Sequence, residues 1–158
     1  MSNQDVVFAL VTFLHDLFTA VWIGGLLTLT LSVLPSARSV LGAGPQVKAL
    51  MNAIQGRLSR LVYFSIVGLI VTGLLQARQN DDFAGLFSTA NDYTLVLTLK
   101  HVLVLVMIAI TLIRSLGLKG WKLAAPAKEQ LSIRLLFANA ALGVGVLLLS
   151  GFSAALAA

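Results

Sequence analysis

Cysteine is absent from this 158-residue sequence, and charged residues make up only 11% of it. The absence of cysteine excludes disulfides, thiolate metal sites and the covalent attachment of a c-type haem. Hydrophobic residues make up 58% of the sequence and its mean hydropathy is +0.95, more apolar surface than a soluble core of this length encloses. We therefore expect an integral membrane protein in which histidine, methionine, carboxylate or backbone groups hold any metal.

Ten-residue alternating segments of the kind that form membrane barrels are also missing, whereas apolar runs of about 22 to 29 residues recur. Because lipid offers the backbone no hydrogen-bonding partner, the predicted fold class is all-α. Short connections between successive helices favour an integral membrane antiparallel four-helix bundle. We expect a single membrane domain over residues 1–158, with helices at about 6–34, 58–77, 93–116 and 131–156.

Two prolines mark expected boundaries. Pro35 lacks an N–H group and disfavours helix in the residue before it, so the first helix is expected to end at Leu34. Pro45 suits a first helical position, and residues 45–57 are expected to form an amphipathic segment that either lies on the membrane surface or extends the second helix. Asn139 is a candidate for a hydrogen bond between helices.

Positive charge is concentrated in and beside the first and third connections, where nine of the 11 Lys and Arg residues lie. By the positive-inside rule these connections face the cytoplasm, which predicts a multi-pass protein of the cell (inner or plasma) membrane with both termini outside. The +5 net charge therefore indicates topology, with the lipid bilayer as a partner and no nucleic acid. Arg57 and Arg60 are one helical turn apart and are expected to contact lipid phosphate.

The functional prediction depends on the only two histidines of the chain, His15 and His101. In this topology the first and third helices both enter the membrane from outside. At 1.5 Å per residue, both imidazoles are then expected about 12 to 14 Å along their helices. Ionisable residues at membrane depth are costly, so they indicate function by default.

Two imidazoles at one depth on separate helices suit the bis-His ligation of a b-type haem. His15 and His101 are thus the predicted metal ligands of a haem b protein that transfers electrons or belongs to a membrane oxidoreductase complex. The alternative is copper on the same histidines, which suits Cu(II) better than Cu(I) because a methionine cluster is missing. A further alternative is a structural membrane subunit without a cofactor. An electron-transfer or transport component is favoured over a stand-alone enzyme.

Charged and aromatic neighbours complete the candidate site. Asp16 and Lys100 adjoin the histidines, and each is expected either to pair with the other or to act separately. In the second case either Lys100, with Arg78, meets a haem propionate, or Asp16 supplies a proton. Trp22 lies on the same helical stripe as His15 and joins the cofactor-binding candidates. The expected partners are other membrane subunits of a redox complex or a periplasmic redox or copper protein.

A series of short motifs follows the expected helices in order. They are His15 with Trp22-Ile23-Gly24-Gly25, the helix ending Leu34-Pro35, then Arg57-Leu58-Ser59-Arg60, Thr72-Gly73 and Leu99-Lys100-His101. In these motifs the chain resembles the CopD family of copper-resistance membrane domains over nearly its whole length. The resemblance implies a four-helix membrane domain linked with periplasmic copper handling, often copper import.

The chain is also more distantly similar to the membrane protoporphyrinogen oxidase of the HemJ type, a haem-associated enzyme. The pattern of that enzyme is a His ahead of a Trp in the first helix, which His15 and Trp22 match, and a His and a Lys close together in the third. Lys100 and His101 match the second part in adjacent rather than spaced order. The fourth helix lacks the Pro- and Lys-containing ending associated with the oxidase, which argues against that enzyme activity.

Overall fold

The structure is a computed structural model that describes residues 2–79, 85–117, 120–122 and 124–156. These residues are almost entirely helical and include no strand. Four helices are long and apolar enough to cross a membrane, and they are Asn3–Leu41, Pro45–Ala77, Asp92–Gly117 and Ala125–Leu156. Many of their large apolar side chains are exposed, as expected of helices that face lipid. The predicted all-α integral membrane class is confirmed.

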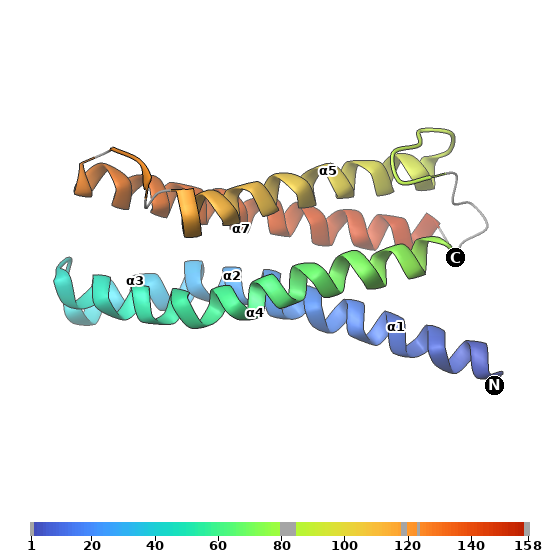
Figure 1. Cartoon of the computed structure of the whole chain (residues 1–158), viewed down its shortest axis with the longest axis horizontal. Coiled ribbons are helices and arrows are strands. Elements are labelled where there is room, and N and C mark those ends of the chain that lie inside the picture. The colour runs from blue at the N-terminus through green and yellow to red at the C-terminus, as the bar shows by residue number, and fades with distance from the viewer. Residues whose placement is uncertain (1, 80–84, 118–119, 123, 157–158) are drawn as a thin grey trace. The chain divides into compact units, whose positions relative to one another are not determined.

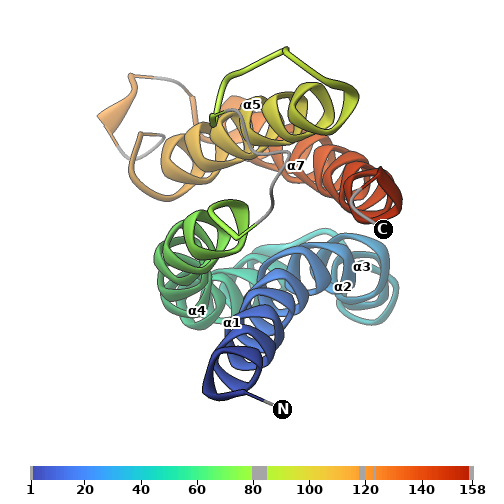
Figure 2. The same cartoon turned by 90° about the vertical axis from the view of Figure 1, so that its right-hand side faces the viewer.

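The chain divides into two compact units, residues 1–76 and residues 77–158, which we call the N-terminal and C-terminal units. The N-terminal unit holds the first two long helices, and the C-terminal unit holds the last two. Within each unit the paired helices lie side by side over much of their length (Figures 1 and 2). Their assembly into one antiparallel four-helix bundle, and the single membrane domain over residues 1–158, stay predictions.

The first long helix is built from five consecutive segments, two of which are π-helical. They are α1 (Asn3–Thr19), η1 (Ala20–Gly24), α2 (Gly25–Thr28), η2 (Leu29–Val33) and α3 (Leu34–Leu41). The helix begins with a capping box, in which the Ser2 side chain accepts from the Asp5 backbone and the Asp5 side chain accepts from the Ser2 backbone. It ends where Gly42 adopts a φ of +71°, a conformation that residues with a β-carbon disfavour.

This helix continues through Pro35 to Leu41, beyond the end that was expected at Leu34. Proline lacks the N–H that would bond the carbonyl four residues earlier, which is the reason it usually stops a helix. Here η2 comes directly before it, and the wider π-helical turn changes the hydrogen-bonding register at that point. Pro35 therefore occupies the first turn of α3, where its missing N–H costs little.

The second long helix, α4 (Pro45–Ala77), is continuous, so residues 45–57 extend the second spanning helix. This is one of the two alternatives left open for that segment. Three contacts between the first helix and α4 join residues of rising number to residues of falling number, so the two helices are antiparallel. These contacts are His15 with Thr72, Phe18 with Phe64 and Gly25 with Leu58.

The C-terminal unit consists of α5 (Asp92–Leu112), η3 (Ile113–Gly117) and α7 (Ala125–Leu156). Asn91 caps α5 by accepting from the Thr94 backbone N–H at 2.7 Å. The helices α5 and α7 pack against each other in antiparallel order, through Leu103 with Gly145, Thr111 with Asn139, and Arg114 with Ser132. The expected hydrogen bond of Asn139 between helices is present, since its Nδ2 donates to Thr111 Oγ1 at 3.1 Å.

Candidate functional site

His15 lies on α1 and is hydrogen-bonded to α4. Its Nδ1 lies 2.9 Å from the hydroxyl oxygen of Thr72, and that hydroxyl donates to the carbonyl oxygen of Gly68 at 2.7 Å. The single hydroxyl hydrogen of Thr72 is thus committed to a carbonyl, which can only accept. With that hydrogen on the Gly68 carbonyl, Thr72 accepts from His15, which assigns the hydrogen of the neutral ring to Nδ1 and its lone pair to Nε2.

Small residues of α4 allow the aromatic rings of α1 to approach its backbone. A β-carbon at Gly73 would lie 3.4 Å from Cε1 of His15, and a β-carbon at Gly68 would overlap the ring of Phe18. Phe18 in turn meets Phe64 edge to face, with 5.6 Å between ring centroids. The position of the imidazole is therefore set both by the Thr72 hydrogen bond and by the absence of a side chain at Gly73, while Gly68 makes room for Phe18.

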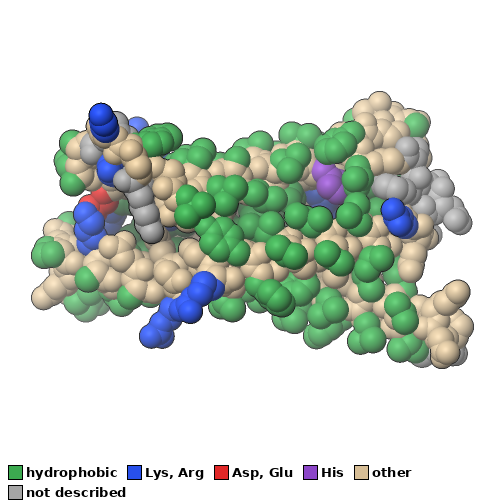
Figure 3. Space-filling view, viewed as in Figure 1, with side chains coloured by type: hydrophobic (Ala, Val, Ile, Leu, Met, Phe, Trp, Pro, Cys, Tyr) green, Lys and Arg blue, Asp and Glu red, His purple; other side chains and the backbone are tan. Residues whose placement is uncertain are grey.

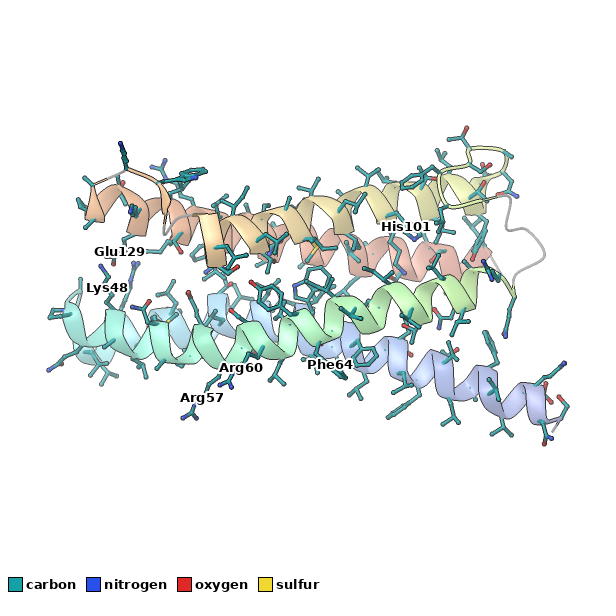
Figure 4. The ribbon with its side chains drawn as sticks, viewed as in Figure 1. Lys48, Arg57, Arg60, Phe64, His101 and Glu129 are labelled. Carbon is teal, nitrogen blue, oxygen red and sulfur yellow. The ribbon has the colours of Figure 1, made fainter. Side chains whose placement is uncertain are left out.

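His101 lies on α5, where Figure 4 labels it, and is held by its own helix. Its Nδ1 lies 2.6 Å from the carbonyl oxygen of Leu97, which can only accept, so Nδ1 again carries the hydrogen. The ring of Phe87 lies against the imidazole at an interplanar angle of 62°, with 6.3 Å between centroids. Thr98 holds the segment around Phe87 by donating to the Ser88 carbonyl at 2.8 Å.

Both imidazoles therefore have the same hydrogen-bonding state, with Nδ1 as donor and Nε2 as the lone-pair nitrogen in the neutral ring. Metal-binding histidines have this arrangement almost always, because the second hydrogen bond fixes the ring and its tautomer. Within the described ranges, no group of three or more His, Asp or Glu side chains forms a metal cluster. The prediction that His15 and His101 share one ligand stays a prediction.

The other sequence-predicted site residues lie as follows. Asp16 is exposed on α1, and Lys100 is half-buried on α5. Because α1 and α5 belong to different units, the ion pair between these residues stays a prediction. Arg78 is exposed in the turn after α4. Trp22 lies in η1 with 1% of its surface exposed, and its indole Nε1 has no hydrogen-bond partner in the described part of the chain. The roles proposed for these residues at a cofactor stay predictions.

Thr72 and Gly73 are the residues whose role the sequence did not predict. In the sequence they stand out only as part of a family resemblance, whereas the structure places both against the His15 ring. The available signal was the spacing Gly68-x-x-x-Thr72-Gly73 within a spanning helix, because small residues one turn apart permit close helix contact. That spacing alone does not say which residue of another helix is contacted.

Comparison with known protein families gives a match over much of the chain. The sequence profile of the family described as Copper resistance protein D matches residues 52–153. The matched range includes Thr72, Gly73 and His101, whereas His15 precedes it. No curated protein and no solved structure matches the chain. The match supports the copper alternative better than the haem b prediction, and it gives no support to the similarity with the HemJ-type oxidase.

Proposed function

This chain belongs to the copper resistance protein D family, and from that premise we propose that it binds copper within the membrane through His15 and His101. The observation that carries the proposal is that Nδ1 of each imidazole lies within hydrogen-bonding distance of a protein oxygen, 2.9 Å from the Thr72 hydroxyl and 2.6 Å from the Leu97 carbonyl. Nε2 is then the ligand atom of both rings, and the family match favours copper as the metal.

The donor set indicates which copper ion is bound. Imidazole nitrogen suits Cu(II), whereas Cu(I) prefers the thiolate and thioether ligands of cysteine and methionine. The chain has no cysteine and only three methionines, one of which, Met107, is completely buried. We therefore assign Cu(II) as the bound ion. Because only the neutral imidazole binds a metal, acidification is expected to weaken binding.

The charge distribution of the chain supports entry of copper from the outer side of the membrane. Nine of the 11 basic residues lie in or beside the first and third connections, which supports a cytoplasmic location for these connections and an outer location for both termini. His15 and His101 then both lie nearer the outer than the inner surface. In this proposal the protein is a transport or electron-transfer component of the inner or plasma membrane. Its partner is a periplasmic copper or redox protein or another membrane subunit.

Thr72 and Gly73 act as positioning residues for His15. The Thr72 hydroxyl selects the tautomer, because it can only accept from the ring once its own hydrogen is donated to Gly68. Gly73 leaves the space that the ring occupies. Partners of this kind typically change metal affinity about 10- to 100-fold when they are removed.

Copper analysis of the purified protein tests the proposal. Protein loaded with Cu(II) and desalted is expected to retain copper, His15→Ala and His101→Ala are each expected to lower the copper-to-protein ratio, and the double variant is expected to retain none. If one ion is shared, either single variant removes all of it, whereas the losses add if each histidine holds its own ion. Asn139→Ala is the matched control, because it removes a buried hydrogen-bonding side chain but no imidazole.

Two results contradict the proposal. The first is a double histidine variant that retains the wild-type amount of copper while folded, as judged by circular dichroism and gel filtration. The second is the absorption spectrum of a b-type cytochrome in the protein as purified, which would restore haem b as the ligand of these histidines.

A further inference from the structure

We propose that the exposed face of α4 binds one anionic phospholipid, with the lipid phosphate on Arg57 and Arg60 and an acyl chain along the apolar stripe that follows. The proposal is independent of copper binding. It rests on the placement, exposure and charge of five residues of this helix, which we call the α4 stripe: Arg57, Arg60, Phe64, Val67 and Val71.

The α4 stripe occupies a single face of the helix. Its members follow one another at intervals of three and four residues, the spacing that places side chains above one another along a helix. All five are exposed, with exposed fractions of 68% for Phe64, 62% for Val67 and 54% for Val71. Figure 4 shows Arg57, Arg60 and Phe64 on the same side of α4, and in the same view Figure 3 shows basic side chains projecting there beside hydrophobic ones.

The dimensions of the stripe fit a phospholipid lying lengthwise. From Arg60 to Val71 the helix rises about 16 Å, close to the thickness of one leaflet of a ~30 Å hydrocarbon core. The two arginines stand at the end of this apolar section and precede the apolar part of a spanning helix. A phosphate held there leaves its acyl chains free to follow Phe64, Val67 and Val71 into the membrane.

Among the residues that the structure describes, no acidic side chain pairs with either guanidinium group. In the described part of the chain, neither Arg57 nor Arg60 forms a hydrogen bond or an ion pair. The helix α4 itself contains three basic residues and no acidic one. By contrast, Arg114 of the C-terminal unit donates to the Ser132 carbonyl at 3.1 Å and so has a role within the protein. Guanidinium binds phosphate in a planar two-point arrangement, which makes a lipid phosphate the partner that fits Arg57 and Arg60.

The charge of the pair selects an anionic lipid over a zwitterionic one. A choline headgroup brings its own cation close to the two arginines, whereas a phosphatidylglycerol headgroup adds none. Each basic residue near an anionic membrane surface contributes about 1 kcal/mol, which is about a fivefold change in affinity. Removal of both charges is therefore expected to lower the preference for phosphatidylglycerol about 25-fold.

Native mass spectrometry of the full-length protein from mixed micelles tests the proposal, with equal amounts of phosphatidylglycerol and phosphatidylcholine. The wild-type protein is expected to retain phosphatidylglycerol in preference, and Arg57→Gln/Arg60→Gln is expected to lose that preference. The matched control is Arg38→Gln/Lys122→Gln, which removes the same charge from exposed positions elsewhere and is expected to keep it. Thermal unfolding confirms that both variants are folded.

Several outcomes overturn the proposal. An equal loss of the phosphatidylglycerol preference in the control variant would mean that only the overall charge matters. A wild-type preference for phosphatidylglycerol in Arg57→Gln/Arg60→Gln would place the lipid elsewhere. Displacement of the bound lipid by glycerophosphoglycerol, which has the headgroup but no acyl chains, at a similar concentration would exclude a contribution from the apolar stripe. Retention of phosphatidylcholine as strongly as phosphatidylglycerol would exclude an anionic site.

Discussion

His15 is held by a neighbouring helix, whereas His101 is held by its own. The acceptor for His15 is the hydroxyl of Thr72 in α4, which itself donates a hydrogen bond to the Gly68 carbonyl. The acceptor for His101 is the Leu97 carbonyl, four residues earlier in α5. The orientation of His15 therefore depends on the packing of α1 against α4, while that of His101 survives any change that leaves α5 helical.

The two units also share one packing device. In each unit a threonine hydroxyl donates to the carbonyl four residues earlier and accepts from a side chain on the opposite helix. Thr72 accepts from His15 in the N-terminal unit, and Thr111 accepts from Asn139 in the C-terminal unit, where it donates to Met107 at 2.9 Å. The amide of Asn139 only links two helices, whereas the imidazole of His15 has a second nitrogen that can bind a metal. A substitution at Thr111 is therefore a natural control for the same substitution at Thr72.

The largest effect is expected from Gly73→Val. A β-carbon added at this position would lie 3.4 Å from Cε1 of His15. The two methyl groups of valine would therefore displace the ring. Copper retention is expected to fall as far as in His15→Ala, measured as the copper-to-protein ratio after desalting. Gly145→Val is the control, because its β-carbon also meets a neighbour, Leu103, at 3.4 Å. It is expected to keep His101 functional, since the Leu97 hydrogen bond lies within α5. Equal copper loss in both variants would show that general packing damage is the cause.

A smaller effect is expected from Thr72→Val, which keeps the shape of the side chain but removes the hydroxyl. His15 then loses the acceptor that fixes its tautomer, and Cu(II) affinity is expected to fall about 10- to 100-fold. Thr72→Ser keeps the hydroxyl and is expected to restore most of the affinity. Isothermal titration in detergent measures the change. An unaltered affinity in Thr72→Val would remove Thr72 from the site.

Thr111→Val is expected to change stability but not copper binding. It breaks the hydrogen bond from Asn139, and such bonds between membrane helices contribute about 1 kcal/mol. Thermal unfolding in detergent is expected to show a decrease of a few degrees, with the copper ratio of the wild type. Loss of copper together with the stability would contradict the separate roles assigned to Thr72 and Thr111.

Among the variants expected to weaken copper binding, the smallest effect is expected from Phe87→Leu. The ring of Phe87 meets the His101 imidazole edge-on, a contact between aromatic rings that is worth about 0.5–1.5 kcal/mol. The substitution is expected to weaken copper binding only a few-fold, because the Leu97 carbonyl still orients the imidazole. Phe13→Leu is the control, since Phe13 is exposed on α1. A loss as large as that of His101→Ala would mean that Phe87, not Leu97, fixes the ring.

Much of the fold was predictable because composition and length determine it. Long apolar runs in lipid must be helical, so the all-α class and the four spanning helices follow from the sequence. The course of the chain at Pro35 was not predictable, because it depends on the π-helical turn η2 that precedes the proline. The continuity of α4 through residues 45–57 was one of two alternatives that the amphipathic pattern left open.

The histidines of the candidate site could be singled out from the sequence, but the groups that hold them could not. The chain is apolar, has no cysteine and has only two histidines, so these are the candidates for metal ligands. The partner of His15 is 57 residues away, and its identity depends on the register between α1 and α4. That register is fixed by contacts such as Phe18 against Gly68, which involve the shapes of particular side chains and leave no periodic signal. The partner of His101 is a backbone atom, which no sequence pattern marks.

Nitrogen-15 NMR of protein labelled at histidine is the most direct test of the central claim, that both imidazoles bind copper through Nε2. The metal-free protein is expected to show two rings with a protonated Nδ1 and an unprotonated Nε2. Stoichiometric Cu(II), which is paramagnetic, is expected to broaden both sets of signals beyond detection. Rings protonated at Nε2, or signals that stay sharp in the presence of bound Cu(II), would contradict the claim.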